Sequence, residues 1–378
     1  MNVRYLFLAV VLATTQSLAA DARPLPAPPI IGAASYLVID GKTGETLASL
    51  QPDNPVAPAS LTKLMTAYVA FRALREEQIR LEDEVTVSEK AWRTPGSRMF
   101  IEVGKRVSIE NLMLGMIVQS GNDASVALAE HIAGSESVFA EMMNQHAREL
   151  GMLSSNFMNV TGLPHADHYS TARDLATLAQ AIIVEFPDYY RWYSVRDFTF
   201  NDIKQPNRNN LLWRDESVDG MKTGFTDAAG YCLVASAERD DMRVVSVVLG
   251  TSSAKARIDG SQALLNYAFR FFETRLVYEA RAEIARPRIW KSANEYSPLG
   301  LLEDLYVTIP RGSYDSLESV LNMPAILLAP VAEGQPLAEI TISLNGEPVA
   351  TESLRALNDN PDGSFWQRTR DSVSLMLE

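Results

Sequence analysis

The chain contains a single cysteine, Cys232, and four histidines among its 378 residues. One cysteine excludes an intramolecular disulfide framework and any zinc site built from several thiolates. Basic residues are fewer than acidic ones: the chain has 34 lysines and arginines and 47 aspartates and glutamates, so its formal net charge is −13. An acidic surface is repelled by phosphate backbones, which argues against nucleic acid as the main partner. We therefore expect no metal or other cofactor and no nucleic-acid partner.

Long hydrophobic runs are scarce as well. Tyr5–Ala13 is apolar but too short to span a bilayer, it follows the basic Arg4, and Ser17–Ala20 offers small residues suited to signal peptidase. We interpret residues 1–20 as a secretory signal peptide rather than a membrane-spanning helix. Since no other stretch is long and apolar enough to span, we expect an exported protein that folds without disulfides.

Helix-like stretches occupy the middle of the first two thirds of the chain, and strand-like stretches flank them on both sides. The expected helices are residues 60–74, 109–118, 124–133, 135–150, 171–184 and 259–272, and the expected strands are residues 36–40, 45–50, 197–200, 220–224, 230–237 and 243–249. This order predicts an α+β domain over residues 21–274 whose terminal strands share one sheet.

The pattern changes after about residue 275, where apolar and polar residues alternate with the period of a strand. Asn345-Gly346 is a strong signal for a hairpin turn. We interpret residues 275–361 as a small all-β sandwich domain and residues 358–363 as a linker. Residues 362–378 then form a separate amphipathic helix.

Three short motifs carry chemistry, and each also occurs elsewhere in the chain as a decoy. The motifs are Ser60-x-x-Lys63, Ser120-x-Asn122 and Lys222-Thr223-Gly224. Decoys include the pair Ser252 and Lys255 for the first motif and Lys42-Thr43-Gly44 for the third. Because a chain of this length holds about one copy of such patterns by chance, only their context can identify the functional copies.

The context favours one copy of each motif. Ser60 begins an expected helix, so Lys63 lies one turn further on the same face, where a neutral amine can take the hydroxyl proton. Ser120-x-Asn122 interrupts two apolar helices and can therefore project into a cleft, and Lys222 and Gly224 share one face of a strand. The decoy at Lys42 occupies a hairpin tip that we expect to point into solvent.

Together with their flanks, the three motifs resemble one family of enzymes. Pro58–Thr66, Ser120–Ala124 and Asp219–Gly224 are similar to the low-molecular-mass penicillin-binding proteins, and more narrowly to the D-alanyl-D-alanine carboxypeptidases of the penicillin-binding protein 5 and 6 type, peptidase family S11. The similarity covers nearly the whole chain after residue 20. It implies a penicillin-binding-protein/β-lactamase-like catalytic domain, a helical cluster with an antiparallel sheet, followed by the β-sandwich.

The resemblance also implies a role for each motif residue. Ser60 would attack the bond between two D-alanines of a peptidoglycan stem pentapeptide, with Lys63 as base and Ser120 as proton relay to the leaving amine. β-Lactam antibiotics would acylate the same serine. The residues expected to bind substrate are Asn122, the carboxylate-binding Lys222 and Thr223, Gly224, Phe225 through its backbone N–H, and Arg257.

One residue sets this chain apart from the family, and two alternative functions remain open. Relatives usually carry histidine where this chain has Phe225, so substrate fit or deacylation can differ although a backbone oxyanion donor remains. A serine β-lactamase is one rival, but no Glu-x-x-x-Asn pattern lies between Ser120 and Lys222. A catalytically silent peptidoglycan-binding protein is another, although such a protein has no need of Ser60 and Lys63.

Three remaining predictions concern single residues and the C-terminus. His165 and His168 lack an evident third metal ligand, so a solvated loop is the simpler interpretation, and Cys232 is expected to be a buried strand residue. In residues 364–378, Phe365, Trp366, Val373, Met376 and Leu377 gather on one side of a helix too short to span a bilayer. The resemblance implies a periplasmic protein whose tail attaches it peripherally to the outer face of the inner membrane.

Overall fold

The computed structural model describes residues 25–377, so the expected signal peptide at residues 1–20 lies outside the described residues. A five-stranded antiparallel sheet forms the centre of the first domain, in the order β2-β1-β9-β8-β7. Its strands are β1 Ser35–Asp40, β2 Thr46–Leu50, β7 Val218–Thr226, β8 Gly230–Arg239 and β9 Met242–Thr251. Since β1 pairs with β9, the prediction that strands from both ends of this domain share a sheet is confirmed.

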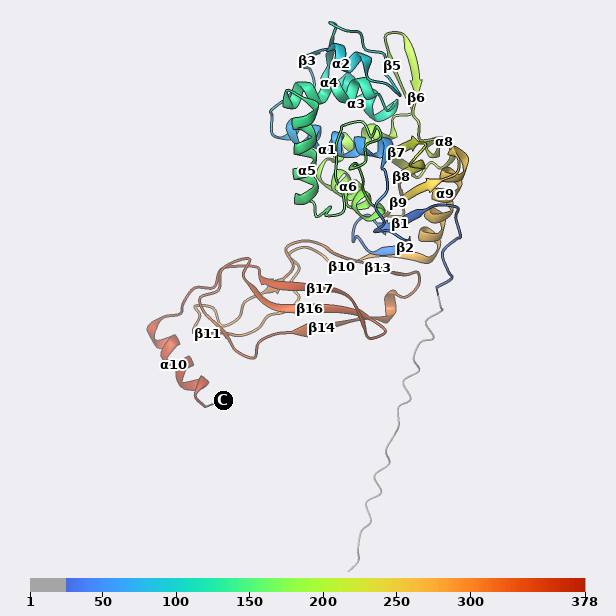
Figure 1. Cartoon of the computed structure of the whole chain (residues 1–378). Coiled ribbons are helices and arrows are strands. Elements are labelled where there is room, and N and C mark those ends of the chain that lie inside the picture. The colour runs from blue at the N-terminus through green and yellow to red at the C-terminus, as the bar shows by residue number, and fades with distance from the viewer. Residues whose placement is uncertain (1–24, 378) are drawn as a thin grey trace, which may run out of the picture.

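Both faces of this sheet are covered (Figure 1). Val245 and Val247 of β9 pack into the core under the helical cluster, whereas Val244 and Val248 face α9, Ala254–Phe271, on the other side. Burial on both faces explains why β9 reads as a nearly continuous apolar run rather than an alternating one. Cys232 of β8 is fully buried in this sheet, as predicted.

The helices form where the sequence places their caps. The side chains of Ser108, Ser135 and Thr171 each accept a backbone N–H in the first turn of the following helix. By contrast, α9 begins about five residues earlier than expected, because Ser253 caps it and Lys255 lies inside it. The helical elements before α9 are η1 Ala59–Leu61, α1 Thr62–Arg75, α2 Glu89–Arg93, α3 Ile109–Val118, α4 Asn122–Ala133, α5 Glu136–Glu149, α6 Ala172–Glu185, α7 Pro187–Tyr190, η2 Arg191–Ser194 and α8 Leu211–Arg214.

Two short strand pairs complete the first domain, and a separate β-structure follows it. β3 Glu84–Thr86 pairs with β4 Arg106–Ser108 across the segment that contains α2, and β5 Asp197–Phe200 forms a hairpin with β6 Ile203–Pro206. The second domain has its own apolar core and consists of strands, as predicted. Its elements are β10 Phe272–Tyr278, β11 Ile289–Trp290, β12 Leu299–Gly300, β13 Leu305–Pro310, η3 Tyr314–Ser316, β14 Leu317–Asn322, β15 Leu327–Leu328, β16 Pro336–Leu344 and β17 Glu347–Ala356.

The expected Asn345-Gly346 turn joins β16 to β17, and both residues have positive φ, 54° and 84°. This is the backbone conformation that a two-residue hairpin turn demands and that Asn-Gly adopts most readily. The four-stranded sheet β12-β17-β16-β14 and the pair β10-β13 extend away from the first domain (Figure 1).

The two domains are joined without a spacer, because α9 ends at Phe271 and β10 begins at Phe272. The turn between β1 and β2 rests on the second domain, where Thr43 Oγ1 lies 2.7 Å from Thr308 Oγ1. Lys42 stands over the ring of Tyr306 at 4.6 Å from its centroid. Lys42 is exposed, as predicted for this hairpin tip, but the tip also contacts the second domain, which the sequence did not predict.

The prediction of a flexible linker at residues 358–363 is wrong. Asn360 is only 1% exposed, and its Nδ2 donates to the carbonyl oxygen of Asn294 and to Ser297 Oγ, at 2.7 and 2.9 Å. These two hydrogen bonds hold the segment against the β-domain. The Asn, Asp, Pro and Gly residues of this segment suggested flexibility, but the polar side chain of Asn360 is buried and hydrogen-bonded to the β-domain.

The C-terminal helix α10, Phe365–Leu375, is held to the β-domain by its polar side. The buried carboxylate of Asp371 accepts from the backbone N–H of Lys291 at 2.7 Å and lies 3.6 Å from Arg288. The helix is thus not detached, and Asp371 lies away from the apolar side as predicted. No helix among residues 25–377 is long and apolar enough to cross a bilayer.

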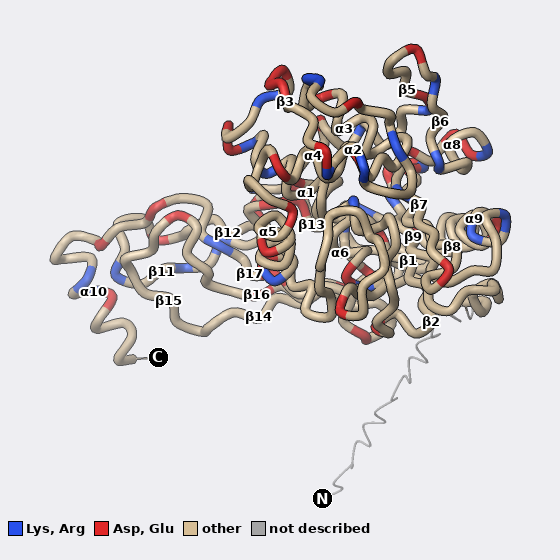
Figure 2. The backbone as a smooth tube through the Cα atoms, turned by 45° about the horizontal axis from the view of Figure 1, so that its top comes forward, with Lys and Arg blue, Asp and Glu red and all other residues tan. Residues whose placement is uncertain are grey.

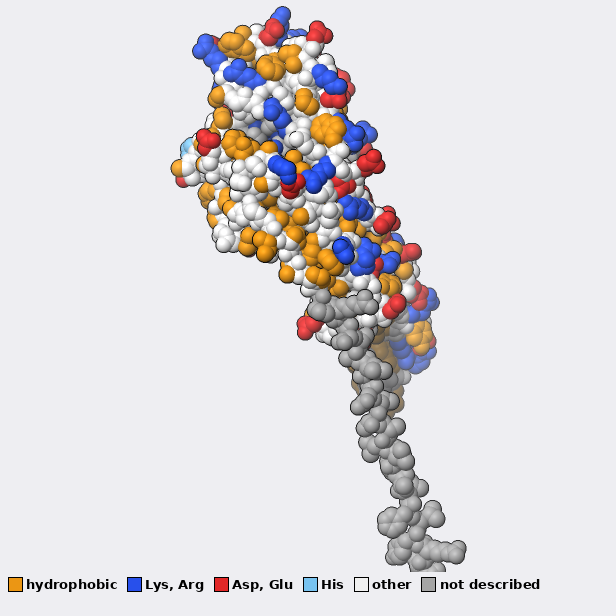
Figure 3. All heavy atoms as spheres, turned by 90° about the vertical axis from the view of Figure 1, so that its right-hand side faces the viewer, with side chains coloured by type: hydrophobic (Ala, Val, Ile, Leu, Met, Phe, Trp, Pro, Cys, Tyr) orange, Lys and Arg blue, Asp and Glu red, His pale blue; other side chains and the backbone are white. Residues whose placement is uncertain are grey.

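Charged residues of both signs are interspersed along the backbone of both domains (Figure 2). The face turned toward the viewer in Figure 3 likewise shows hydrophobic side chains scattered between charged ones. Neither view shows the continuous basic stripe that would track a nucleic-acid backbone.

Candidate active site

Ser60 and Lys63 meet at the start of α1. Ser60 lies in the 3₁₀ turn η1, and Lys63 follows in the first turn of the α-helix, so the two side chains project from the same face. Lys63 Nζ is 3.2 Å from Ser60 Oγ and donates to the carbonyl oxygen of Thr161 at 2.7 Å. The amine is therefore within reach of the serine proton.

The amine of Lys63 is in an unusual electrostatic environment. Burial lowers the pKa of Lys63 to about 7, and the nearby Asp123 acts in the opposite direction. Asp123 is itself held by backbone N–H groups of Met99 and Phe100, both at 3.0 Å. A substantial neutral fraction of Lys63 at neutral pH satisfies the first requirement of a general base.

Ser120 lies in the break between α3 and α4, as predicted, and Asn122 is the first residue of α4. Ser120 has a positive φ of 67°, and its buried Oγ has no hydrogen-bond partner within the described residues. Asn122 Nδ2 donates to the Pro95 carbonyl oxygen at 2.6 Å, and its buried Oδ1 has no partner among residues 25–377. Buried polar atoms without partners are costly, so both oxygens are suited to receive groups from a ligand.

Lys222, Thr223 and Gly224 lie on β7, directly beside the serine turn. Burial and the neighbouring Lys63, Arg208 and Arg257 lower the pKa of Lys222 well below its ordinary value. A Cβ on Gly224 would lie 3.1 Å from the Pro58 carbonyl oxygen, closer than most side chains tolerate. Glycine at this position lets β7 approach the turn that carries Ser60.

Phe225 and Arg257 have different relations to the cleft. The Phe225 ring is 48% exposed and packs on Tyr231, with 4.2 Å between centroids. Arg257 of α9 is buried behind β7 and donates to the Gly224 carbonyl oxygen at 3.1 Å. Phe225 therefore borders the cleft, whereas Arg257 holds β7 through the Gly224 carbonyl oxygen and is not among the residues that line the cavity.

A cavity of about 430 Å³ contains the nucleophile Ser60 and Asn122 of the second motif, whereas no residue of the Lys222-Thr223-Gly224 motif is among its lining residues. It is lined by Ser60, Gly96, Ser97, Asn122, Thr161, Gly162, Leu163, Arg208, Phe225 and Thr226. Arg208 was missed by the sequence reasoning, although it supplies a cation to this cavity. It lies in a loop 14 residues before Lys222, and no local spacing marks it.

The loop between α5 and α6 supplies further groups that the sequence did not reveal. His168 is buried, its Nε2 lies 2.8 Å from Thr62 Oγ1, and its Nδ1 accepts the Met158 N–H at 3.1 Å. The expectation of a solvated loop thus holds for the exposed His165 but is wrong for His168. Burial and the neighbouring His165 lower the pKa of His168 to about 4, so it stays neutral at pH 7.

Family models match both domains. Residues 23–253 match the model described as D-alanyl-D-alanine carboxypeptidase, peptidase S11, and this match covers more than half of the chain. The chain belongs to the D-alanyl-D-alanine carboxypeptidase family S11. Residues 272–361 of this family member match the C-terminal domain of penicillin-binding protein 5, which confirms the resemblance noted from the motifs.

Curated relatives and solved structures agree with this membership. "D-alanyl-D-alanine carboxypeptidase DacC" of Escherichia coli is 42% identical over 356 residues, 92% of this chain and 89% of the relative. "D-alanyl-D-alanine carboxypeptidase DacA" of Haemophilus influenzae is 40% identical, over 93% and 91% of the two chains. The crystal structure of penicillin-binding protein 5 from H. influenzae superposes with a TM-score of 0.86 at 42% identity, covering 89% of this chain and all of that one. The expected S11 fold is confirmed.

Proposed function

We propose that this family member is a serine-type D-alanyl-D-alanine carboxypeptidase that acts on peptidoglycan pentapeptide stems and is acylated by β-lactams. Ser60 Oγ attacks the carbonyl carbon between the two D-alanines, the C–N bond breaks, and the terminal D-alanine leaves. Water then cleaves the ester on Ser60. The observation that carries this proposal is the 3.2 Å approach of the buried Lys63 amine to Ser60 Oγ.

Two groups manage the proton in this scheme. Neutral Lys63 takes the proton from Ser60 as the hydroxyl attacks, which its lowered pKa of about 7 permits. Ser120, whose buried Oγ has no partner among the described residues, passes a proton to the departing amine. The backbone N–H groups of Ser60 and Phe225 bind the developing oxyanion, where losing one donor costs about 100- to 1,000-fold in rate.

The remaining residues bind the substrate in this proposal. Asn122 holds the peptide amide, and Lys222 and Thr223 bind the terminal carboxylate, whose binding Arg257 assists. The burial of Arg257 behind Gly224 makes its contribution indirect, through the position of β7 and the positive potential around Lys222.

The role of Arg257 can be tested with paired substrates. Because its charge acts on the substrate carboxylate, Arg257→Ala should lower kcat/KM for a peptide ending in a free carboxylate about tenfold or more. The same variant should affect the C-terminally amidated peptide much less. Equal losses on the two peptides would show that Arg257 only supports the strand.

The assignment of Ser60 is tested by intact-protein mass spectrometry with benzylpenicillin. We expect a covalent adduct that persists for many minutes, beside release of D-alanine from a stem pentapeptide. Ser60→Ala should lose both, because no other oxygen replaces the nucleophile. Ser252→Ala, at the exposed decoy motif, is the matched control and should retain both.

The outcomes also separate the proposal from its rivals. Rapid loss of the adduct would indicate a β-lactamase, and no adduct on the unaltered chain would indicate a binding protein. An adduct that survives in Ser60→Ala would remove Ser60 from its role. The absence of a Glu-x-x-x-Asn pattern between Ser120 and Lys222 and the additional β-domain both favour the carboxypeptidase.

We also propose that the protein works in the periplasm, attached peripherally to the outer face of the inner membrane by α10. The support is an inverted amphipathic helix, with its acidic side turned to the β-domain and its apolar side turned to solvent. Trp366 is 78% exposed and Met376 is 85% exposed, whereas Asp371 is buried. Such an exposed apolar face is suited to the lipid interface.

A further inference from the structure

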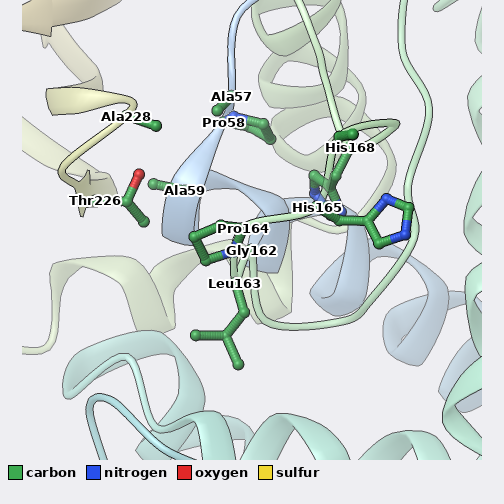
Figure 4. A pocket seen from close by; sticks show the side chains of 11 residues that line it. Ala57, Pro58, Ala59, Gly162, Leu163, Pro164, His165, His168, Thr226 and Ala228 are labelled. Atoms are coloured by element: carbon green, nitrogen blue, oxygen red, sulfur yellow. The ribbon is translucent and has the colours of Figure 1, made fainter.

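The cavity shown in Figure 4 adjoins the one that contains Ser60, because Gly162, Leu163 and Thr226 line both, and it belongs to the same site. A different cavity, of about 430 Å³, lies in the β-domain and shares no lining residue with either of these two. The reaction proposed for Ser60 therefore does not explain it.

The cavity of the β-domain is formed by three segments that are separate in the sequence. Its volume lies within the range of about 300–1,000 Å³ that small-ligand sites occupy. The lining residues are Arg286, Asn294, Tyr296, Ser297, Pro298, Asn358, Asp359 and Asn360.

Hydrogen bonds of one buried side chain join two of these segments. Asn360 is 1% exposed, and its Nδ2 donates to the Asn294 carbonyl oxygen and to Ser297 Oγ. Its Oδ1 accepts the backbone N–H of Asn294 at 3.0 Å. The adjacent Asp359 is held as well, because its Oδ1 accepts the Glu333 N–H at 2.8 Å. The cavity is thus preformed, which reduces the entropy lost when a ligand binds.

The lining is polar, and its formal charges cancel. Arg286 is the only cation and Asp359 the only anion among the lining residues, and Arg286 Nε also donates to Glu283 at 2.8 Å. Neither an anionic nor a cationic ligand therefore meets an excess of opposite charge. Tyr296 and Pro298 supply the apolar surface, which is too little for a lipid chain. A neutral ligand rich in polar groups fits this lining best.

The exposed side chains of the cavity offer the groups that recognise a sugar. The ring of Tyr296 is 52% exposed, and an aromatic face packs against the C–H groups of a pyranose. Asn294 and Asn358 are exposed, and each side-chain amide offers both donors and an acceptor to neighbouring hydroxyls. The same amides match an acetamido group, which has one N–H donor and one carbonyl acceptor.

We infer that this cavity binds a neutral saccharide that carries acetamido groups. The glycan strands of peptidoglycan carry such groups, so the site holds the protein on the polymer whose stem peptides the proposed reaction trims. Saccharide binding itself does not rest on the proposed function, because none of the residues assigned to the reaction lines this cavity.

Isothermal titration calorimetry with chitotetraose, a soluble oligomer of N-acetylglucosamine, tests this inference. We expect saturable binding to the unaltered protein. Cellotetraose, which has hydroxyls in place of the acetamido groups, should bind about tenfold more weakly, because the hydrogen bonds to those groups are lost.

Two substitutions should each weaken the binding of chitotetraose at least tenfold. Tyr296→Ala removes the aromatic face, and Asn358→Ala removes one exposed amide while the buried Asn360 remains in place. The matched control is Tyr314→Ala, which removes a tyrosine of the same domain that is 41% exposed and does not line the cavity. It should bind chitotetraose like the unaltered protein.

The outcomes separate this inference from the proposed function. The absence of saturable chitotetraose binding, or equal affinity for cellotetraose, would overturn it. Unchanged affinity in Tyr296→Ala would also overturn it, and if that variant is unfolded, Asn358→Ala decides in its place. Acylation by benzylpenicillin, measured on the same samples, should be equal in all of them. Its failure in the unaltered protein would remove the proposed function, whereas the titration alone decides the saccharide site.

Discussion

Lys63 is the residue whose environment matters most to the proposed chemistry. It is only 2% exposed, and its Nζ is shared between Ser60 Oγ and the Thr161 carbonyl oxygen. Lys222, also buried, lies close enough that the charge on Lys63 contributes to lowering the pKa of Lys222. Two ammonium groups in one apolar site are unfavourable, which favours a neutral amine on one of them.

A pH profile follows from the pKa of Lys63. Protonated Lys63 cannot accept a proton, so the rate constant for acylation by benzylpenicillin should fall about tenfold per pH unit below 7 and level off above it. Mass spectrometry of the adduct at short times between pH 5 and 9 measures this rate. Lys255→Ala, which removes the exposed lysine of the decoy motif, should leave the profile unchanged. A rate independent of pH across this range would contradict the role of Lys63 as base.

The sequence could predict the residues of this site whose positions depend on local structure. Ser60 and Lys63 are one helical turn apart, and Lys222 and Gly224 alternate on a strand, so spacing alone relates them. Arg208 and His168 were not predicted, because the fold brings them to the site from loops distant in sequence. The Thr161 carbonyl that accepts from Lys63 is a backbone group, and backbone groups leave no mark in side-chain identity.

At the scale of elements, the loop between α5 and α6 acts as a second wall of the site. Thr161 accepts from Lys63, and Gly162 follows with a φ of +83° directly against the serine turn. A Cβ on Gly162 would overlap the Ala59 carbonyl oxygen. The close packing of this loop on η1 therefore depends on the absence of a side chain at one position.

Gly162→Ala should consequently reduce penicillin acylation at least 100-fold, because the loop must move away from Ser60 and Lys63. Gly151→Ala is the matched control, since its φ of +78° imposes the same backbone strain but no atom lies within 4 Å of the added Cβ. That control should lose about 1 kcal/mol of stability and keep its acylation rate. Thermal unfolding and the acylation rate are measured on both variants. Together they separate the backbone strain of a positive φ, which both share, from the steric overlap with Ala59, which only Gly162→Ala has. Equal acylation rates in the two variants would refute this argument.

Element boundaries were predictable where a cap stands in the sequence, as at Ser108 and Thr171. Composition misled at residues 358–363, where Asn, Asp, Pro and Gly suggested a free linker. The hydrogen bonds of Asn360 to Asn294 and Ser297 join residues more than 60 positions apart. No local pattern distinguishes such an ordered segment from a flexible one.

At the scale of the whole molecule, the sequence predicted two domains and their classes, but it did not predict how they contact each other. The β1–β2 turn rests on β13 through Thr43 and Thr308, a contact between positions 265 residues apart. Figure 1 shows the consequence, because the β-domain extends from the bottom of the catalytic sheet and carries α10 at its far end. The active site and α10 thus belong to opposite parts of an elongated molecule.

The last prediction concerns attachment to membranes through this distant helix. Phe365 and Trp366 lie at its start and are 67% and 78% exposed, while Asp371 holds the helix to Lys291 from the other side. The double substitution Phe365→Ser with Trp366→Ser removes the aromatic part of the apolar face and keeps Asp371. It should weaken binding to vesicles that contain anionic lipid at least tenfold in a sedimentation assay, because buried apolar area drives interfacial binding.

The control for this prediction is Trp213→Ser, which removes another exposed aromatic side chain, 48% exposed, from the catalytic domain. It should bind vesicles like the unaltered chain. Penicillin acylation should be the same in all three proteins, since α10 lies at the far end of the β-domain from Ser60. Truncation after Gly363 should release the protein into the soluble periplasmic fraction, although it also removes Asp371 and leaves Arg288 without that partner. Vesicle binding that survives the loss of both aromatic residues would show that another surface, and not α10, meets the membrane.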